Sequence, residues 1–236
     1  MGGESEIEFH PGELAALAGE PFIEIFGSRR HVLQRCRMAH PGERIVSCGD
    51  VSENVFFLCK GWAFRFLRVP DGGRQIFDFL LPGDIFSPTS VVDERFTFSV
   101  EALTEVQVGE VQRESLARQL MSPTLQSGWV RDFARHFRTT DELIVALGRR
   151  TAEDRVAHLI FQLTRRMWLR DLTREHRFPF PAKLGHIADA VGLTPESVCR
   201  VLGRFRRRGI FALSNGYLEI LDFDELERVG SLRSGI

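Results

Sequence analysis

Residues 183–209 read KLGHIADAVGLTPESVCRVLGRFRRRG. The first part has apolar residues at the spacing of one helix face, at Ile187, Ala188 and Val191. The small Ala188 allows a second helix to cross closely over the first. Another helical pattern, with its own apolar face, begins at Pro195. The sequence therefore predicts two helices, 183–191 and 195–208, that pack against each other.

The residues between these helices are those that a tight turn needs. Gly192 stands where the chain must turn with positive φ, which costs glycine little. Thr194 is a favoured N-cap, and Pro195 suits the first helical position. Glu196 is stabilised by the positive end of the helix dipole. These residues predict a helix-turn-helix.

The second helix separates apolar from polar side chains. Its inner face is predicted to hold Val198, Val201, Leu202 and Phe205. Its outer face carries residues that can contact a DNA duplex, and the candidate set, completed by His186 of the first helix, is Thr194, Glu196, Ser197, Cys199, Arg200, Arg204 and Arg207. Arg200 can donate two hydrogen bonds to guanine, Glu196 can accept one from cytosine, and the later arginines suit phosphates. The alternative is an ordinary helical hairpin with a charged surface.

Charge is segregated along the chain, although the whole protein has a formal net charge of −1. Residues 149–208 contain 14 Arg or Lys and 6 Asp or Glu, whereas the flanking regions are acidic. Such a basic block predicts a surface that binds a polyanion. A solvated, charged helix face would give the same count.

The region from Met38 to Val111 has a different pattern, typical of an antiparallel sandwich or barrel. Turn signals such as Pro70-Asp71-Gly72-Gly73 separate short runs rich in Phe and Val. The predicted strands are Val55–Cys59, Trp62–Val69, Arg74–Leu80, Thr97–Leu103 and Val106–Val111. Residues 10–35 have apolar positions at helical spacing and predict one or two short helices.

A long helix is predicted to follow the strands. Its apolar residues recur at steps of three and four, with one polar member, at Val130, Phe133, Phe137, Thr140, Ile144 and Leu147. This is the spacing of a coiled-coil seam and predicts a dimer interface. The two aromatic members could instead face the barrel. A second amphipathic helix is predicted over 151–176, ended by Pro179 and Pro181.

Other classes of protein find little support in the composition. No apolar run approaches the length of a membrane span, and the acidic N-terminus does not resemble a signal peptide, so we expect a cytoplasmic protein without membrane contact. The four cysteines lack the grouping of a zinc site, and no metal is expected. Neither a phosphate loop nor a nucleophile elbow is present, so an enzyme is not expected.

The chain resembles the cyclic-AMP-receptor/FNR family of bacterial regulators over roughly residues 20–225. The resemblance is carried by Ile187-Ala-Asp-x-x-Gly-Leu-Thr-x-Glu-Ser-Val-x-Arg200 and by Gly148-Arg-Arg-Thr-Ala-Glu-Asp-Arg-Val-Ala157. It implies an α+β fold with a cyclic-nucleotide-binding-type antiparallel β-barrel (jelly roll) in 1–120, a dimerisation helix in 121–150 and a winged helix-turn-helix in 151–236. The implied partners are double-stranded DNA, a second copy of the chain (homodimer) and RNA polymerase.

The Glu-x-x-x-Arg pair formed by Glu196 and Arg200 resembles the pair found in the FixK and FNR branches of that family. Those branches read inverted repeats of the TTGA…TCAA type, so the resemblance implies a transcription activator with such a target.

Several departures from the family pattern bear on the effector. Ser87-Pro88 stands where the nucleotide pocket has Gly-Glu, and Phe96-Thr97 stands where it has Arg-Ser, with Arg95 one residue away. A slip of one residue along a strand turns a side chain to the other face, so binding of cyclic AMP is not expected. An iron–sulfur cluster is not expected either, because the grouped cysteines are absent. Thus no cofactor is predicted. The alternative is a ligand-dependent regulator whose barrel binds an unidentified small molecule or haem.

Cys199 lies inside the second predicted helix, 195–208, next to Arg200. A neighbouring guanidinium and a nearby helix N-terminus favour the thiolate form. Oxidation would place a bulky or charged group against DNA. The hypothesis is that oxidation of Cys199 weakens DNA binding; the alternative is a small residue that is merely tolerated there.

Overall fold

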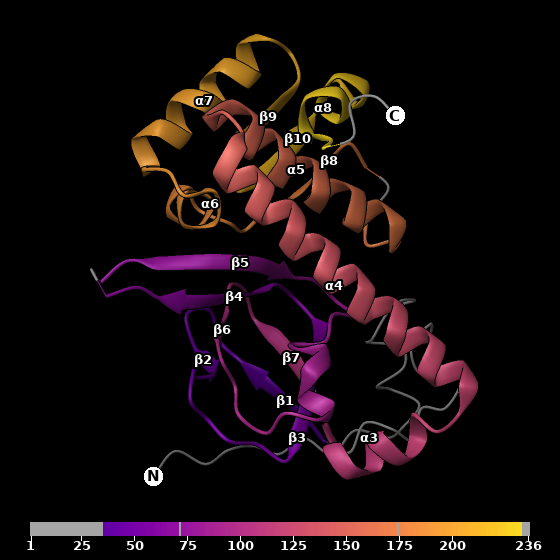
Figure 1. Cartoon of the computed structure of the whole chain (residues 1–236). Helices are drawn as coiled ribbons and strands as arrows, with labels where there is room; N and C mark the ends of the chain where they lie inside the picture. Colours follow the sequence, from indigo (N-terminus) through magenta and orange to yellow (C-terminus); the bar gives the residue numbers. More distant parts are fainter. Residues whose placement is uncertain (1–34, 71, 174, 233–236) are drawn as a thin grey trace. The chain divides into compact units, whose positions relative to one another are not determined.

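Short Phe- and Val-rich runs form the strands of the N-terminal region. The structure, a computed structural model, describes residues 35–70, 72–173 and 175–232 (Figure 1). The N-terminal strands are β1 (Arg35–Ala39), β2 (Arg44–Val46), β3 (Asn54–Lys60), β4 (Ala63–Arg68), β5 (Arg74–Leu80), β6 (Ser99–Ala102) and β7 (Val106–Gln112). All five strands predicted from sequence are present within a residue or two of their expected ends. β1 and β2 were not predicted, and the helices expected over 10–35 lie almost entirely outside the described residues.

These strands form two sheets, and the pairs whose register is resolved are antiparallel. One sheet has the order β1-β7-β3 and the other β2-β6-β4-β5. A short 3-10 helix, η1 (Pro88–Val91), lies between β5 and β6 in the chain. The core is rich in aromatic rings, and the fully buried ones include Phe57, Phe64, Phe66, Phe79 and Phe86. These phenylalanine side chains therefore form much of the hydrophobic core of the N-terminal sheets.

Three helices follow the strands. They are α3 (Arg113–Gln119), α4 (Pro123–Arg149) and α5 (Ala152–Leu169). α5 begins with a capping box in which Thr151 and Asp154 exchange hydrogen bonds. The prediction that this helix continues to residue 176 is wrong: it ends at Leu169, and Asp171 adopts a left-handed backbone with φ of 52°. Pro179 is the last residue of the strand β8 (Arg177–Pro179) and Pro181 comes after it, so neither proline ends the helix.

The C-terminal region contains the predicted pair of helices and a small sheet. Its elements are β8 (Arg177–Pro179), α6 (Leu184–Val191), α7 (Pro195–Arg207), β9 (Phe211–Ser214), β10 (Tyr217–Ile220) and α8 (Phe223–Gly230). The sheet has the order β8-β10-β9 and is antiparallel. The hairpin of β9 and β10 follows the helix pair directly, which makes this a winged helix-turn-helix. The predicted α+β fold is confirmed.

The chain divides into two compact units. Of the described residues, one unit takes those from Arg35 to Leu67 together with Phe79–Phe137, and the other takes Arg68–Asp78 together with those from Arg138 to Leu232. In the second unit, Phe205 of α7 stacks on Phe211 of β9 with ring centroids 4.7 Å apart. None of the helices in the described parts of the chain is long and apolar enough to cross a membrane.

Candidate nucleic-acid interface

The turn between α6 and α7 has the geometry that its sequence predicts. Gly192 ends α6 in a left-handed conformation, with φ of 63°. The Thr194 hydroxyl accepts a hydrogen bond from the backbone N–H of Ser197 at 3.3 Å, which caps α7. Val198, Val201 and Phe205 are buried on the inner face of α7, and Leu202 is partly buried. The inner face thereby fixes which side chains of α7 point outward.

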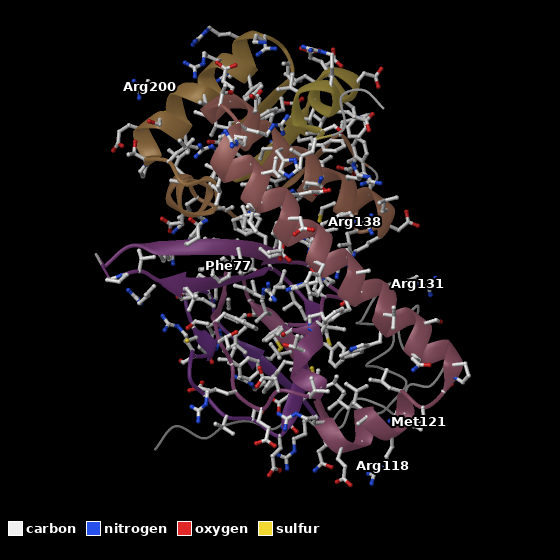
Figure 2. The ribbon with its side chains drawn as sticks, viewed as in Figure 1. Phe77, Arg118, Met121, Arg131, Arg138 and Arg200 are labelled. Atoms are coloured by element: carbon white, nitrogen blue, oxygen red, sulfur yellow. The ribbon has the colours of Figure 1, made fainter. Side chains whose placement is uncertain are left out.

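The first turns of α7 present a carboxylate and a guanidinium together. Glu196 and Arg200 are both exposed, and Figure 2 shows Arg200 on the outer side of α7. Nη2 of Arg200 donates to Oγ of Ser197 at 3.1 Å. The pKa of Glu196 is lowered by a hydrogen bond from its own backbone N–H, then by the Thr194 hydroxyl and by the charge of Arg200. An ionised acceptor and a positioned donor thus lie side by side.

An open groove of about 610 Å³ runs along this outer face. Five of the predicted DNA-binding residues line it: Glu196, Cys199, Arg200, Arg204 and Arg207. Thr194 and Ser197 form the cap at its end rather than its wall. The groove also includes Leu184 of α6 and Gly203, which sequence reasoning missed because neither carries a polar group. Leu184 is part-exposed and can make the kind of apolar contact that a thymine methyl accepts.

The later arginines of α7 are engaged by carboxylates of other elements. Nε of Arg204 lies 2.5 Å from Oε1 of Glu153, and Nη1 of Arg208 lies 3.3 Å from Oε2 of the same residue. Arg208 also reaches Glu225 of α8 at 3.1 Å. The sequence predicts that Arg204 suits a phosphate, and the structure pairs its side chain with Glu153 at the start of α5.

His186, the one candidate from α6, does not line the groove. It is half-buried, and its Nδ1 accepts a hydrogen bond from the backbone N–H of Lys183 at 3.1 Å. Burial lowers its pKa, and the nearby charge of Arg74 lowers it further. Arg74 itself pairs with Asp189 at 2.5 Å. The structure therefore places His186 as an N-terminal cap of α6, beside the Arg74–Asp189 pair.

The predicted seam on α4 is an apolar face that is open in the single chain. Val130 is 59% exposed, Phe137 59% and Ile144 64%, while Phe133 is partly exposed. The rings of Phe133 and Phe137 are 5.0 Å apart, so they form one patch. Thr140 is exposed on the same helix. Leu147 differs: it is half-buried, and its side chain lies against Gly192 at the turn.

Residues 87–98 were expected to include a strand, but they form η1 and loops, and Arg95 makes only an isolated bridge with Val51. Arg95 is exposed, and its Nη1 donates to the carbonyl of Gly49 at 2.7 Å. Phe96 and Phe98 are buried. Arg65 of β4 is a buried cation. Its guanidinium donates to the carbonyl of Phe86 at 2.8 Å and lies over the ring of Phe98. Sequence reasoning did not single out Arg65.

The cysteines differ in their exposure. Cys199 and Cys48 are exposed, whereas Cys59 is buried and Cys36 is partly buried. Within the described ranges, no group of three His, Cys, Asp or Glu side chains is arranged to hold a metal ion.

Comparison with known proteins assigns both halves of the chain. Residues 154–229 match the Crp-like helix-turn-helix domain family, and residues 36–122 match the cyclic nucleotide-binding domain family. The nitrogen fixation regulation protein FixK of Azorhizobium caulinodans is 34% identical over 77% of this chain and 73% of its own length. The transcriptional activator protein FnrA of Stutzerimonas stutzeri is 28% identical over 81% of this chain and 78% of its own length.

A solved structure shares the fold. FixK2 from Bradyrhizobium japonicum superposes with a TM-score of 0.75 and 24% identity, over 84% of this chain and 98% of that one. The two relatives are regulatory proteins, and no enzyme family is indicated. The chain is thus a member of the Crp/Fnr family of transcription regulators, with an N-terminal sheet domain of the cyclic-nucleotide-binding type and a C-terminal helix-turn-helix that binds DNA.

Proposed function

We propose that this protein activates transcription as a homodimer that reads an inverted repeat of the TTGA…TCAA type without a cyclic nucleotide. The observation that carries the proposal is the outer face of α7, where Glu196 and Arg200 lie side by side and exposed. A guanidinium can bind the O6 and N7 atoms of guanine, and a carboxylate can accept from the amino group of cytosine. One α7 helix therefore offers donors and acceptors for a short half-site.

The open apolar face of α4 supports the homodimer. Val130, Phe133, Phe137 and Ile144 would leave water if a second α4 packed against them. Two copies related by a twofold axis present two α7 helices to the two halves of an inverted repeat. Under this proposal residues 121–150 form the dimerisation helix, between a sensor-type domain in 1–120 and a DNA-binding domain in 151–236.

The position of Arg95 supports a function that needs no cyclic nucleotide. A buried phosphate needs a cationic partner, and the guanidinium of Arg95 instead bonds a backbone carbonyl at the surface. The names of the relatives support activation, since FnrA is called a transcriptional activator. Contact with RNA polymerase and a cytoplasmic location are part of the same proposal.

A ligand-dependent regulator is the second candidate, and one observation favours it. The buried guanidinium of Arg65, stacked on Phe98, is a cation within the sheet domain. An anionic small molecule would find there the charge that Arg95 does not provide. Dependence of DNA affinity on an added effector separates this candidate from the first.

Oxidation of Cys199 is a further element of the proposal. Its thiol is exposed in the groove beside Arg200. Hydrogen peroxide oxidises a thiol to a sulfenic acid: one peroxide oxygen is transferred to sulfur and the other leaves as water. The larger, polar group would then face the base edges. We expect peroxide to weaken DNA binding by the wild type and to leave Cys199→Ser unaffected; equal responses of the two proteins would refute a role for this thiol.

The test of the main proposal is binding of the purified protein, without effector, to a duplex carrying TTGA-N6-TCAA and to a scrambled duplex at fixed salt. Preferential binding with two chains per duplex is the expected result. Weak, salt-sensitive binding of both duplexes alike would overturn it.

A further inference from the structure

The junction between α4 and α5 is held by the end of a distant helix. Only Arg150 and Thr151 connect the two helices. The guanidinium of Arg150 donates to three successive backbone carbonyls at the C-terminal end of α8, those of Val229 at 2.8 Å, Gly230 at 3.1 Å and Ser231 at 3.1 Å. The last carbonyls of a helix lack partners within it and carry partial negative charge. Arg150 therefore caps α8 from the junction.

The same end of α8 is fixed against α5. Nδ1 of His158 lies 2.8 Å from the carbonyl of Gly230, and it donates there because a carbonyl only accepts. Burial lowers the pKa of His158, against the opposing effects of the Gly230 carbonyl and the Glu142 carboxylate. A Cβ on Gly230 would lie 2.6 Å from Cβ of Phe161 and 2.8 Å from the carbonyl oxygen of Ala157. This close approach leaves α8 little room to shift along α5.

α5 also contacts α4 through side chains. Nε2 of Gln162 donates to Oε2 of Glu142 on α4 at 3.1 Å, and Nε2 of His158 lies 3.9 Å from the same oxygen. Arg155 of α5 donates to the carbonyl of Arg150 at 3.1 Å. The last turns of α4, the junction, α5 and the end of α8 are thus joined by one set of contacts, here called the hinge bracket: Glu142, Arg150, His158, Gln162 and the carbonyls of residues 229–231.

We propose that the hinge bracket sets the angle between α4 and α5, and with it the half-site spacing that the dimer accepts. The proposal rests on the proposed function, in which α4 forms the dimer axis and α7 reads DNA. Because α7 packs on α5, a change in the angle at the junction moves each α7 relative to that axis. Half-site spacing follows from where the two recognition helices lie. Arg150 is a positioning residue in this scheme.

The test uses TTGA-N6-TCAA duplexes whose spacer is shortened or lengthened one base pair at a time, and a duplex with a single half-site. The variants are Arg150→Ala, which removes all three hydrogen bonds, and Arg150→Lys, which keeps the charge without the planar fork. Arg149→Ala is the matched control, because it removes one positive charge from the exposed neighbour. Circular dichroism and thermal unfolding verify that each variant is folded.

The wild type and Arg149→Ala are expected to prefer one spacer sharply. In Arg150→Ala the ratio of affinities between the preferred spacer and its neighbours should fall toward one, with a smaller fall in Arg150→Lys. Affinity for the single half-site should stay unchanged. If the folded variants keep the wild-type spacer profile, or lose as much affinity for the single half-site as for the repeat, the hinge bracket does not set the half-site spacing. Either result leaves the proposed function standing. A wild type that prefers no inverted repeat overturns both.

Discussion

At the N-terminal end of α7, Arg200 is held by Ser197 and attracted by Glu196, which both belong to the same helix. At the C-terminal end, Arg204 and Arg208 are held by Glu153 of α5. Side chains of one type therefore have different partners only a turn or two apart. The first arrangement leaves a positioned donor open to a ligand, whereas the second ties the helix to its neighbours.

This difference indicates that the two ends of α7 have different roles in binding DNA. Base recognition needs a donor in a fixed direction, which the cap and the first turns provide. Contacts to phosphate need only positive charge nearby, and an arginine that shares a surface ion pair can still supply part of it. We therefore expect substitutions at the N-terminal end to change specificity, and those at the C-terminal end to change affinity for all sequences alike.

The largest effect is expected from Arg200→Ala. A bidentate contact to guanine contributes about 1–3 kcal/mol of discrimination per half-site, so the two half-sites of a repeat together lose about 2–6 kcal/mol. Binding to the scrambled duplex should change little. Arg206→Ala is the control, since it removes the same charge from an exposed position of α7. Equal losses in the two variants would show that Arg200 contributes charge and not base recognition.

The part of this site that was predictable from sequence is the part set by local residues. Gly192, Thr194 and Pro195 lie in one turn, and their conformational preferences act within a few residues. The strand Arg74–Leu80 was also predicted with its observed ends, because the turn residues Pro70-Asp71-Gly72-Gly73 precede it in the chain. Such signals do not depend on how the rest of the chain folds.

The contacts that escaped prediction join residues far apart in sequence. Glu153 precedes Arg204 by about fifty residues, and Arg150 bonds carbonyls about eighty residues later. Many acidic residues could have been the partner of Arg204, and nothing in the pattern selects one. The end of α5 was missed for a different reason, because Asp171 takes a left-handed backbone without being a glycine.

A smaller effect is expected from Thr194→Ala at the N-terminal end. Loss of the hydroxyl removes the cap, which should lower the free energy of unfolding by about 0.5–2 kcal/mol. The carboxylate of Glu196 also loses one of its hydrogen bonds, so its pKa should rise toward the ordinary value. Urea unfolding and an NMR titration measure the two changes. Thr194→Ser keeps the hydroxyl and should preserve both; a loss of stability in Thr194→Ser as large as in Thr194→Ala would argue against the cap.

Arg204→Ala is expected to have a smaller effect than Arg200→Ala on specificity and a smaller effect than Thr194→Ala on stability. The side chains of Arg204 and Glu153 are 45% and 33% exposed, so loss of their ion pair should lower the free energy of unfolding by no more than about 1 kcal/mol. Affinity should fall by a similar factor for the repeat and for the scrambled duplex, measured at one salt concentration. Selective loss of binding to the repeat would contradict the division between the two ends of α7.

The smallest effect is expected from Glu153→Gln, and its sign is opposite. Without the carboxylate, Arg204 can turn toward phosphate, whereas Arg208 keeps its pair with Glu225. Affinity for the scrambled duplex should then rise slightly, and its salt dependence should steepen by about 0.9 for each added phosphate contact. Glu227→Gln, which removes a negative charge from an exposed site on α8, controls for net charge. If both variants steepen the salt dependence equally, the gain comes from the overall field. If only Glu153→Gln steepens the salt dependence, the Glu153 carboxylate limits the number of α7 arginines that contact phosphate.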